Sequence, residues 1–377
     1  MKNHTISFFL SFLLLIVSCS SDEDEPIPDN KETEEEKRPT NLQEYNNTTD
    51  GLKDYYTADT YFEIGAAIEP SSLDKAEEVD LMKRHFSSLT AENVMKWSSL
   101  QRSEGNFNFT SADKIVDFAQ ANGMKVRGHT LCWYNQTPDW VFKDGDNTAS
   151  KELVLERLRT HISTVMKHFK GKVYAWDVVN EAIDDGSGTY RASKWFVICG
   201  SDFIIEAFKA AREADTEAKL FYNDYSTVSP TKREKIFKLL KRLNDQNLID
   251  GVGMQSHWNI GYPSDELVIE AFDKYTSLGL EIHITELDVS VYTADSDPES
   301  AYTTDIAQKQ VAAYSDFFSL FRRYKDHVSS VTFWGLADNH TWLDNFPVRG
   351  RKNYPFLFDT DYNPKEAYFS VIEKLGS

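Results

Sequence analysis

The chain has 377 residues, of which 41 are Lys or Arg and 60 are Asp or Glu, so its formal net charge is −19 at pH 7. Such an acidic chain is a poor partner for nucleic acid or anionic lipid, because phosphate binding needs a basic surface. Hydrophobic residues make up 41% and charged residues 27%, which excludes a wholly disordered chain, a collagen-like chain and a polytopic membrane protein.

The first 18 residues have the pattern of a secretion signal. Lys2 precedes an uncharged apolar run from Ile6 to Val17, which is too short for a transmembrane helix of about 20 residues. The run ends in a sequence, Ile16–Cys19, that resembles a bacterial lipobox. We therefore expect a lipoprotein signal peptide over residues 1–18, cleavage before Cys19 and a lipid anchor on its sulfur. An ordinary signal peptide with an incidental cysteine is the alternative.

Residues 19–44 are predicted to form an acidic, disordered tether. Between Asp22 and Arg38 the chain holds nine acidic and three basic residues, and such a segment cannot bury enough apolar surface to offset its ordering entropy. The acidic run at residues 21–25 also resembles the export signals of surface lipoproteins in some Gram-negative bacteria, although any charged tether looks alike. We expect a cell-envelope lipoprotein at the outer membrane, which touches the membrane only through its lipid.

From residue 45 to residue 377, predicted strands alternate with predicted helices. The helical pattern is clear after Ser150, where apolar residues recur at steps of three and four until Gly171, and Ser111 is the expected N-cap of an earlier helix. The eight predicted strands are Tyr61–Ile68, Ser87–Asn93, Lys125–Thr130, Val173–Asn180, Leu220–Asp224, Gly251–Ser256, Glu281–Glu286 and Ser330–Leu336.

Eight strands joined by helical crossovers predict an α/β fold, in which a parallel sheet closes into a (β/α)8 TIM barrel. A length of roughly 330 residues lies within the usual range of this fold. The alternative, an open doubly wound sheet, lacks its glycine-rich loop, since Gly251 and Gly253 have no third glycine after them. We find no internal repeat and no second domain, so residues 45–377 are predicted to be a single catalytic domain.

Polar and aromatic side chains follow the predicted strands at their carboxyl ends, where a barrel carries its chemistry. Glu181 and Glu286 follow apolar strand residues, and a buried carboxylate is costly unless it is paired or functional. Two such carboxylates at a mouth lined with indoles suit glycoside hydrolysis. The sequence has no His-Glu-x-x-His, cysteine cluster, Gly-x-Ser-x-Gly or phosphate loop, so we expect neither a metal site nor a serine nucleophile.

Seven motifs resemble, in order and spacing, those of family-10 glycoside hydrolases, which are chiefly endo-β-1,4-xylanases. They are TAENVMKW, GHTLCW, WDVVNEAI, YNDYS, GMQSHW, ITELDVS and TFWGLAD. The resemblance spans about residues 55–375. It implies a (β/α)8 barrel, endo-hydrolysis of xylan or xylo-oligosaccharides with retention of configuration, and no cofactor.

The resemblance also implies roles for single residues. Glu181 resembles the general acid/base and Glu286 the nucleophile, while His257 and Asp288 are placed to orient Glu286. Asn180 resembles the residue that binds the sugar 2-hydroxyl. The implied substrate-binding residues are Glu92, Asn93, Lys96, His129, Gln255, Trp334 and Trp342 on the glycone side, Trp133 beneath that subsite, and Tyr225 on the aglycone side.

Two further positions follow from the resemblance. Asp177 is expected to support His129, and Tyr134 stands after the indole of the GHTLCW motif, where the family often has histidine. Three functional classes remain in view: a tethered xylanase, the same machinery acting on another β-1,4-glycan such as cellulose, and a non-catalytic glycan-binding lipoprotein. The catalytic residues named above argue against the last class. A monomer is the default expectation for an enzyme that acts on a polymer.

Overall fold

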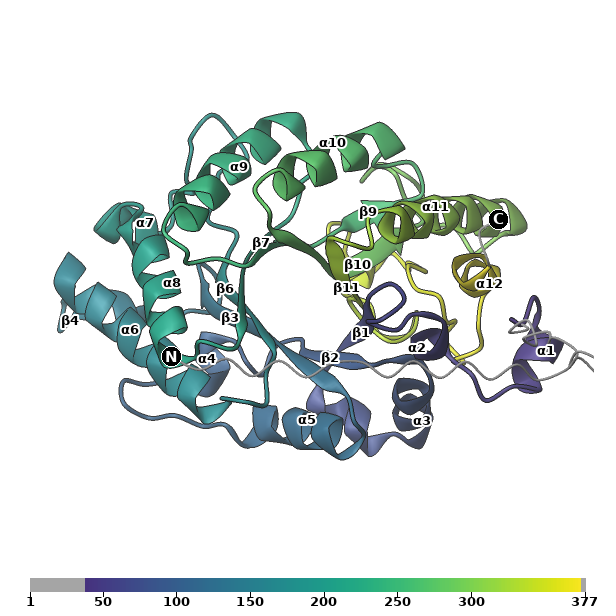
Figure 1. Cartoon of the computed structure of the whole chain (residues 1–377), viewed down its shortest axis with the longest axis horizontal. Coiled ribbons are helices and arrows are strands. Elements are labelled where there is room, and N and C mark those ends of the chain that lie inside the picture. Colours follow the sequence, from purple (N-terminus) through teal and green to yellow (C-terminus); the bar gives the residue numbers. More distant parts are fainter. Residues whose placement is uncertain (1–37, 374–377) are drawn as a thin grey trace, which may run out of the picture. The chain divides into compact units, whose positions relative to one another are not determined.

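The computed structural model describes residues 38–373, and the predictions for residues 1–37, including the signal segment and Cys19, lie outside the described residues. Eight parallel strands form a closed barrel (Figure 1). The ring closes because the last strand pairs with both the first and the seventh, which confirms the predicted (β/α)8 fold. In ring order the strands are β1 (Glu63–Ile68), β2 (Ser88–Ala91), β3 (Lys125–Trp133), β6 (Ala175–Asn180), β7 (Lys219–Asp224), β8 (Gly251–Met254), β10 (Glu281–Ser290) and β11 (Val328–Phe333).

Helices surround the barrel (Figure 1). The longer ones are α3 (Ala76–His85), α5 (Thr110–Ala121), α6 (Lys151–His168), α8 (Asp202–Ala214), α9 (Pro230–Asn244), α10 (Asp265–Thr276) and α11 (Thr304–Arg323). The shorter elements are α1 (Leu42–Asn46), α2 (Leu52–Tyr55), α4 (Trp97–Leu100), α7 (Lys194–Cys199), α12 (Glu366–Ile372) and the hairpin of β4 (Lys143–Asp144) with β5 (Asn147–Thr148). Within residues 38–373, no helix has the length and hydropathy that a membrane crossing requires.

One of the two predicted helix caps is confirmed and the other is wrong. The Ser150 hydroxyl accepts a hydrogen bond from the Leu153 amide and caps α6. Helix α5 begins at Thr110, so Ser111 lies inside its first turn. The side chain of Asn108 accepts from the Thr110 amide, and the helix begins two residues earlier than expected.

Two strands run further than the sequence pattern indicated. Strand β3 continues past the predicted end at Thr130, and β10 continues past Glu286 to Ser290. The extension of β10 is paired with an additional short strand, β9 (His257–Asn259). Their register places His257 directly opposite Asp288. This pairing builds a part of the site that a uniform eight-strand pattern does not predict.

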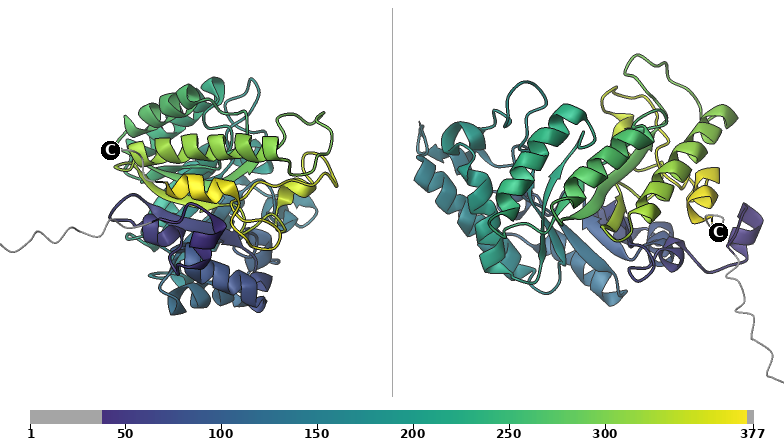
Figure 2. Two further views of the ribbon diagram at one scale, coloured as in Figure 1. Left: turned by 90° about the vertical axis from the view of Figure 1, so that its right-hand side faces the viewer. Right: turned by 45° about the horizontal axis from the view of Figure 1, so that its top comes forward.

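The folded unit begins earlier than the predicted boundary at residue 45. Helix α1 starts at Leu42 and buries Tyr45, whose ring meets the edge of Tyr368 on α12 with ring centroids 5.4 Å apart. Arg38 donates a hydrogen bond to the Ile372 carbonyl. Figure 2 shows α12 beside α11 and close to the first helices. The first and last described elements therefore pack together at one side of the barrel.

Buried side chains fill the inside of the barrel beneath its carboxyl end. Arg127 on β3 binds both carboxylate oxygens of Asp177 on β6 and donates from Nε to His283 on β10, 3.1 Å away. Because β3 and β10 are not neighbours in the sheet, this contact crosses the interior. Phe221 stacks on His283 with centroids 3.9 Å apart. Charged and aromatic groups together close the barrel below the site.

Candidate active site

A cavity of about 690 Å³ opens at the carboxyl ends of the barrel strands. Thirteen of the predicted site residues line it: Glu92, Lys96, His129, Trp133, Asn180, Glu181, Tyr225, Gln255, His257, Glu286, Asp288, Trp334 and Trp342. Asn93 does not line it. The Asn93 side chain instead donates to Glu69 at 2.6 Å and accepts from Lys96 at 3.0 Å, so in this structure it orients Lys96.

Glu286 is held at the centre of this cavity by side-chain donors. His257 Nε2 lies 3.1 Å from Glu286 Oε2, and Asn223 donates to Oε1 at 2.7 Å. His129 Nδ1 lies 3.9 Å from the same Oε1. Burial by itself raises the pKa of Glu286, but the hydrogen bond from His257 and the nearby imidazoles lower it to below its usual value. The carboxyl group is therefore ionised near neutral pH.

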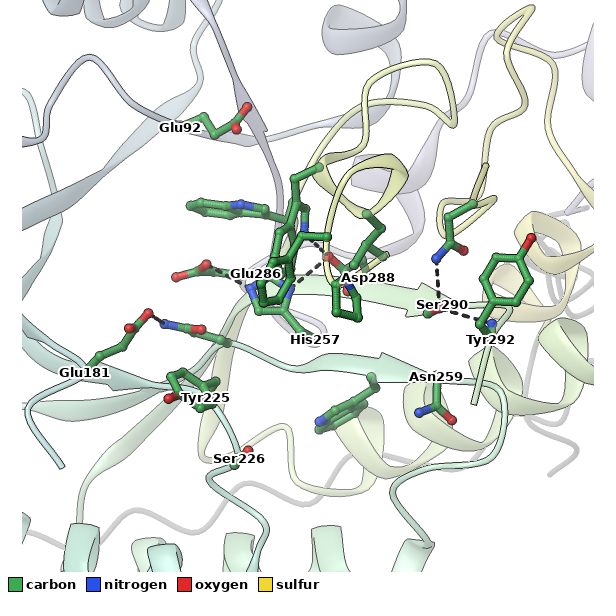
Figure 3. A pocket seen from close by; sticks show the side chains of 18 of the residues that line it. Glu92, Glu181, Tyr225, Ser226, His257, Asn259, Glu286, Asp288, Ser290 and Tyr292 are labelled. Carbon is green, nitrogen blue, oxygen red and sulfur yellow. Dashed lines mark hydrogen bonds and ion pairs between the residues drawn. The ribbon is translucent and has the colours of Figure 1, made fainter. Parts of the chain in front are cut away.

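His257 and Asp288 form the second part of this arrangement (Figure 3). Asp288 Oδ2 lies 2.8 Å from His257 Nδ1 and also accepts from the Trp342 indole at 2.9 Å. Burial lowers the pKa of His257, but Asp288 and Glu286 raise it to about 10. A protonated imidazole donates from both nitrogens, so His257 is a cation between two carboxylates. His257 thus contacts Glu286 and Asp288 at the same time.

Glu181 has different surroundings, because neutral amides hold its carboxyl group. It is the first residue after β6, and its backbone φ is +56°, a conformation that residues with a Cβ seldom adopt. Gln255 donates to Glu181 Oε1 at 2.9 Å, and Asn180 donates to the same oxygen at 3.3 Å. The side chain is buried but lines the cavity. No cation lies within 4.0 Å of it among the described residues.

A chain of amides joins the two carboxyl groups. Asn180 Oδ1 accepts from Gln255 at 3.2 Å and from Asn223 at 3.0 Å, and these two amides also bind Glu181 and Glu286 respectively. Gly253 makes room for this network, because a Cβ at that position would lie 2.3 Å from the Asn223 amide oxygen. The two carboxyl groups therefore face one site with fixed relative positions.

Three of the predicted glycone-side residues, Glu92, Lys96 and His129, lie with Trp133 on the β2 and β3 side of the cavity, whereas Gln255 follows β8 and the two indoles Trp334 and Trp342 follow β11. Burial and the nearby Glu69 raise the pKa of Glu92, and burial lowers the pKa of Lys96. The Lys96 ammonium stands 4.9 Å from the centre of the Trp133 ring. His129 Nδ1 lies 2.9 Å from Asp177, as predicted. These groups provide a cation, a carboxyl group and an indole face for a polar ring.

On the opposite side of the cavity, polar groups contact both the hydroxyl and the ring face of Tyr225. Its hydroxyl donates to Asp185 and accepts from Arg191 at 2.7 Å, while the Lys232 ammonium lies 3.5 Å from the ring centre. Tyr134 also lines the cavity and is 43% exposed, with the Arg191 guanidinium 4.6 Å from its ring centre. Two aromatic side chains are thus available on this side.

The sequence interpretation missed residues that act from beneath the site. Asn223 contacts Glu286 directly. Side chains alternate between the two faces of a strand, and this alternation along β7 could have predicted that Asn223 lies on the inner face. Nothing in the local pattern indicated that Arg127 would pair with Asp177 across strands. The cavity-lining residues between Ser290 and Asp295 were not predicted, because β10 was expected to end at Glu286.

Two carboxyl groups in unlike surroundings are suited to acid–base and nucleophilic roles at one bond. Glu286 is ionised and its lone pairs are oriented, which a nucleophile requires. Glu181 accepts hydrogen bonds from neutral amides and faces the same cavity, a position that suits a residue that gives a proton to a leaving group and later takes one from water. The arrangement fits displacement at a glycosidic carbon.

Comparison with known proteins gives a consistent assignment. The family model described as glycosyl hydrolase family 10 matches residues 51–374. An endo-1,4-beta-xylanase B of Paenibacillus barcinonensis is 48% identical over 316 residues, which cover 82% of this chain and 95% of that protein. An endo-1,4-beta-xylanase of Geobacillus stearothermophilus is 49% identical over 316 residues, with the same coverage of 82% and 95%.

Solved structures agree with this comparison. The crystal structure of a P. barcinonensis xylanase complexed with a conduramine derivative superposes with a TM-score of 0.82 at 47% identity, and covers 85% of this chain and 98% of that one. The endo-1,4-beta-xylanase of Caldicellulosiruptor owensensis gives a TM-score of 0.83 at 46% identity, covering 86% of this chain and 100% of that one.

Proposed function

Since the chain belongs to glycosyl hydrolase family 10, we propose that it cleaves internal β-1,4-xylosidic bonds of xylan with retention of configuration, through a glycosyl-enzyme intermediate. The observation that carries the proposal is the pairing of an ionised Glu286, held by the His257 cation, with Glu181 across a shared set of amides. The relatives named above are endo-1,4-β-xylanases.

In the first step a carboxylate oxygen of Glu286 attacks the anomeric carbon. The bond from that carbon to the leaving oxygen breaks, and Glu181 gives its proton to that oxygen. His257 and Asn223 keep the attacking carboxylate in one orientation. Asn180 is placed between the two carboxyl groups and can bind the sugar 2-hydroxyl there, a contact that strengthens in the transition state.

In the second step Glu181 changes from a general acid to a general base. Esterification has removed the charge of Glu286, and Glu181 is now a carboxylate. It takes a proton from a water molecule, whose oxygen attacks the anomeric carbon from the side that the leaving group has vacated. The ester bond breaks, and Glu286 regains its negative charge beside His257. Two inversions give net retention.

Two indoles favour xylose over glucose in this site. Trp342 is fixed by its hydrogen bond to Asp288, and Trp334 meets His129 edge-on with centroids 5.2 Å apart. Both rings lie beside His257, which contacts Glu286, and their bulk leaves less space for the hydroxymethyl group that glucose carries and xylose lacks. The same machinery acting on cellulose or mixed-linkage glucan is the alternative substrate class.

The test is product analysis on xylan and on soluble cellulose with the chain that begins at Arg38. Short xylo-oligosaccharides from xylan alone are the expected result, with the β anomer formed first in a proton NMR time course. Products from cellulose alone would overturn the substrate assignment and keep the mechanism. Absence of products from both would favour the glycan-binding alternative.

We also propose that the protein is a monomeric lipoprotein of the cell envelope, attached to the outer membrane through Cys19. The support is the lipobox-like sequence before Cys19 and the acidic tether after it. Mass spectrometry of the N-terminal peptide tests the lipid, with Cys19→Ala as the unlipidated control. Protease treatment of intact cells tests surface exposure, and light scattering of the chain from Arg38 tests the oligomeric state.

A further inference from the structure

The backbone at Glu181 is in an unfavourable conformation that its surroundings must maintain. Its φ of +56° lies in the left-handed region, which a side chain with a Cβ rarely occupies. The direction of the Glu181 carboxyl group depends on this conformation, because the backbone sets where the Cβ points. A relaxed backbone would turn the carboxyl group away from Gln255, which donates to it.

A tyrosine hydroxyl holds the chain just after this point. The backbone amides of Ala182 and Ile183 both donate to the Tyr222 hydroxyl oxygen, each at 3.0 Å. Tyr222 lies on β7, is fully buried and does not line the cavity. The Tyr222 oxygen thus supplies the hydrogen-bond acceptor that these two consecutive buried amides would otherwise lack.

The Tyr222 proton must point elsewhere, because two donors already face its oxygen. It is donated to Asp224, which is fully buried and forms an ion pair with Lys232 at 2.8 Å. Burial raises the pKa of Asp224 to about 6 although Lys232 lowers it, and burial also raises the pKa of Tyr222. The hydroxyl therefore keeps its proton and a single orientation.

An arginine holds the other side of the same turn. Arg191 Nε donates to the Glu181 carbonyl at 3.0 Å, and the Arg191 amide donates to the Ala182 carbonyl at 2.8 Å. The other end of its guanidinium donates to the Tyr225 hydroxyl at 2.7 Å. Arg191 does not line the cavity either, so it connects the Glu181 backbone to a side chain that does.

We propose that Tyr222 and Arg191 are positioning residues for proton transfer by Glu181. Tyr222 maintains the left-handed turn that aims the carboxyl group, and Arg191 couples that turn to Tyr225, so that a sugar on the aglycone side stabilises the aligned acid. The inference rests on the proposed function. These two residues act on proton transfer by Glu181 and not on the attack by Glu286.

The first test uses Tyr222→Phe, which removes one oxygen and keeps the ring. The expected result is a loss of about 10²-fold in kcat/KM, which reports the first step, on xylobiosides with poor phenol leaving groups, and a change below about threefold in kcat/KM with dinitrophenol, which leaves without a proton. The matched control is Tyr275→Phe, another fully buried tyrosine, whose hydroxyl donates only to the Thr227 carbonyl. Thermal unfolding verifies that both variants fold.

Equal losses on both leaving groups in Tyr222→Phe would overturn the positioning role, and so would unchanged kinetics. A wild-type enzyme that cleaves neither xylan nor xylobiosides would overturn the proposed function itself, which separates the two failures. If Tyr222→Phe does not fold, the arginine variants decide the question.

The second test uses Arg191→Met and Arg191→Lys. Arg191→Met should lower kcat about tenfold on xylotetraose, which fills the aglycone side, and should lower kcat/KM much less on a dinitrophenyl xylobioside, whose first step needs no proton. Arg191→Lys should recover part of the loss, because its ammonium can still reach one acceptor. Arg212→Met is the matched control, since Arg212 also binds a backbone carbonyl and an aspartate, away from the cavity. A loss confined to KM in Arg191→Met would contradict the coupling.

Discussion

Glu286 and Glu181 occupy the same cavity but are prepared for reaction in opposite ways. Glu286 lies within strand β10, and side chains set its charge, with His257 as a cationic donor. Glu181 follows β6 in a left-handed conformation, and the neutral amides of Asn180 and Gln255 donate to its carboxyl group. The comparison shows that one carboxylate is controlled through its electrostatics and the other through its backbone.

The largest effect should come from removing the nucleophile. In Glu286→Ala no covalent intermediate forms, so we expect kcat on xylan to fall by at least about 10⁴-fold. Binding of xylo-oligosaccharides should remain measurable by calorimetry, because the aromatic faces are unchanged. Undiminished hydrolysis by this variant would refute the assignment of Glu286.

Replacing the acid should give a selective loss. In Glu181→Ala we expect kcat to fall about 10²–10⁴-fold on xylan, since its leaving sugar needs a proton, and far less in the first step with an activated aryl xylobioside. Added azide, which needs no general base, should restore the second step. Losses of equal size on both substrates would contradict the acid role and remove the contrast between the two carboxyl groups.

Asn223 contacts Glu286 through its side chain and Glu181 through its backbone, so a substitution of its side chain can separate the two roles. Its side chain donates to Glu286, while its backbone carbonyl accepts from the Glu181 amide and is kept in any variant. Asn223→Ala should lower kcat about 10–10²-fold, by loss of one hydrogen bond to a charged group, and equally for good and poor leaving groups. The control is Asn244→Ala, which removes a side-chain bond at the end of α9. A dependence on the leaving group would show that Asn223 serves Glu181 instead.

The last expected effect concerns stability and not rate, and it is a pH dependence from His257. Its pKa rises from 6.5 to about 10 on folding, so its stabilising contribution is complete below pH 6.5 and is lost as the pH rises through about 10. The unfolding free energy of the wild type relative to His257→Gln should therefore fall by roughly 2–5 kcal/mol between these pH values. Denaturant titrations at several pH values measure it. A constant difference would mean that His257 is neutral in the folded protein.

The sequence was sufficient for the features that depend on local pattern. Apolar strand segments and helix periodicity predicted all eight barrel strands, and the motifs that resemble those of family-10 glycoside hydrolases implied thirteen of the residues that line the cavity, together with Asn93, which does not line it. The extension of β10 could not be predicted, because it depends on pairing with β9. The left-handed turn at Glu181 depends on Tyr222 and Arg191, which are 41 and 10 residues away in the chain.

The closed interior beneath the site bears on what happens to the covalent intermediate. Arg127, Asp177 and His283 block the barrel from below, so a molecule that attacks the intermediate must enter through the opening left by the departed sugar. Water and a second sugar hydroxyl compete for that one entrance. At high concentrations of short oligosaccharides, part of the intermediate should pass to a sugar acceptor, and the protein would then make chains longer than those it was given.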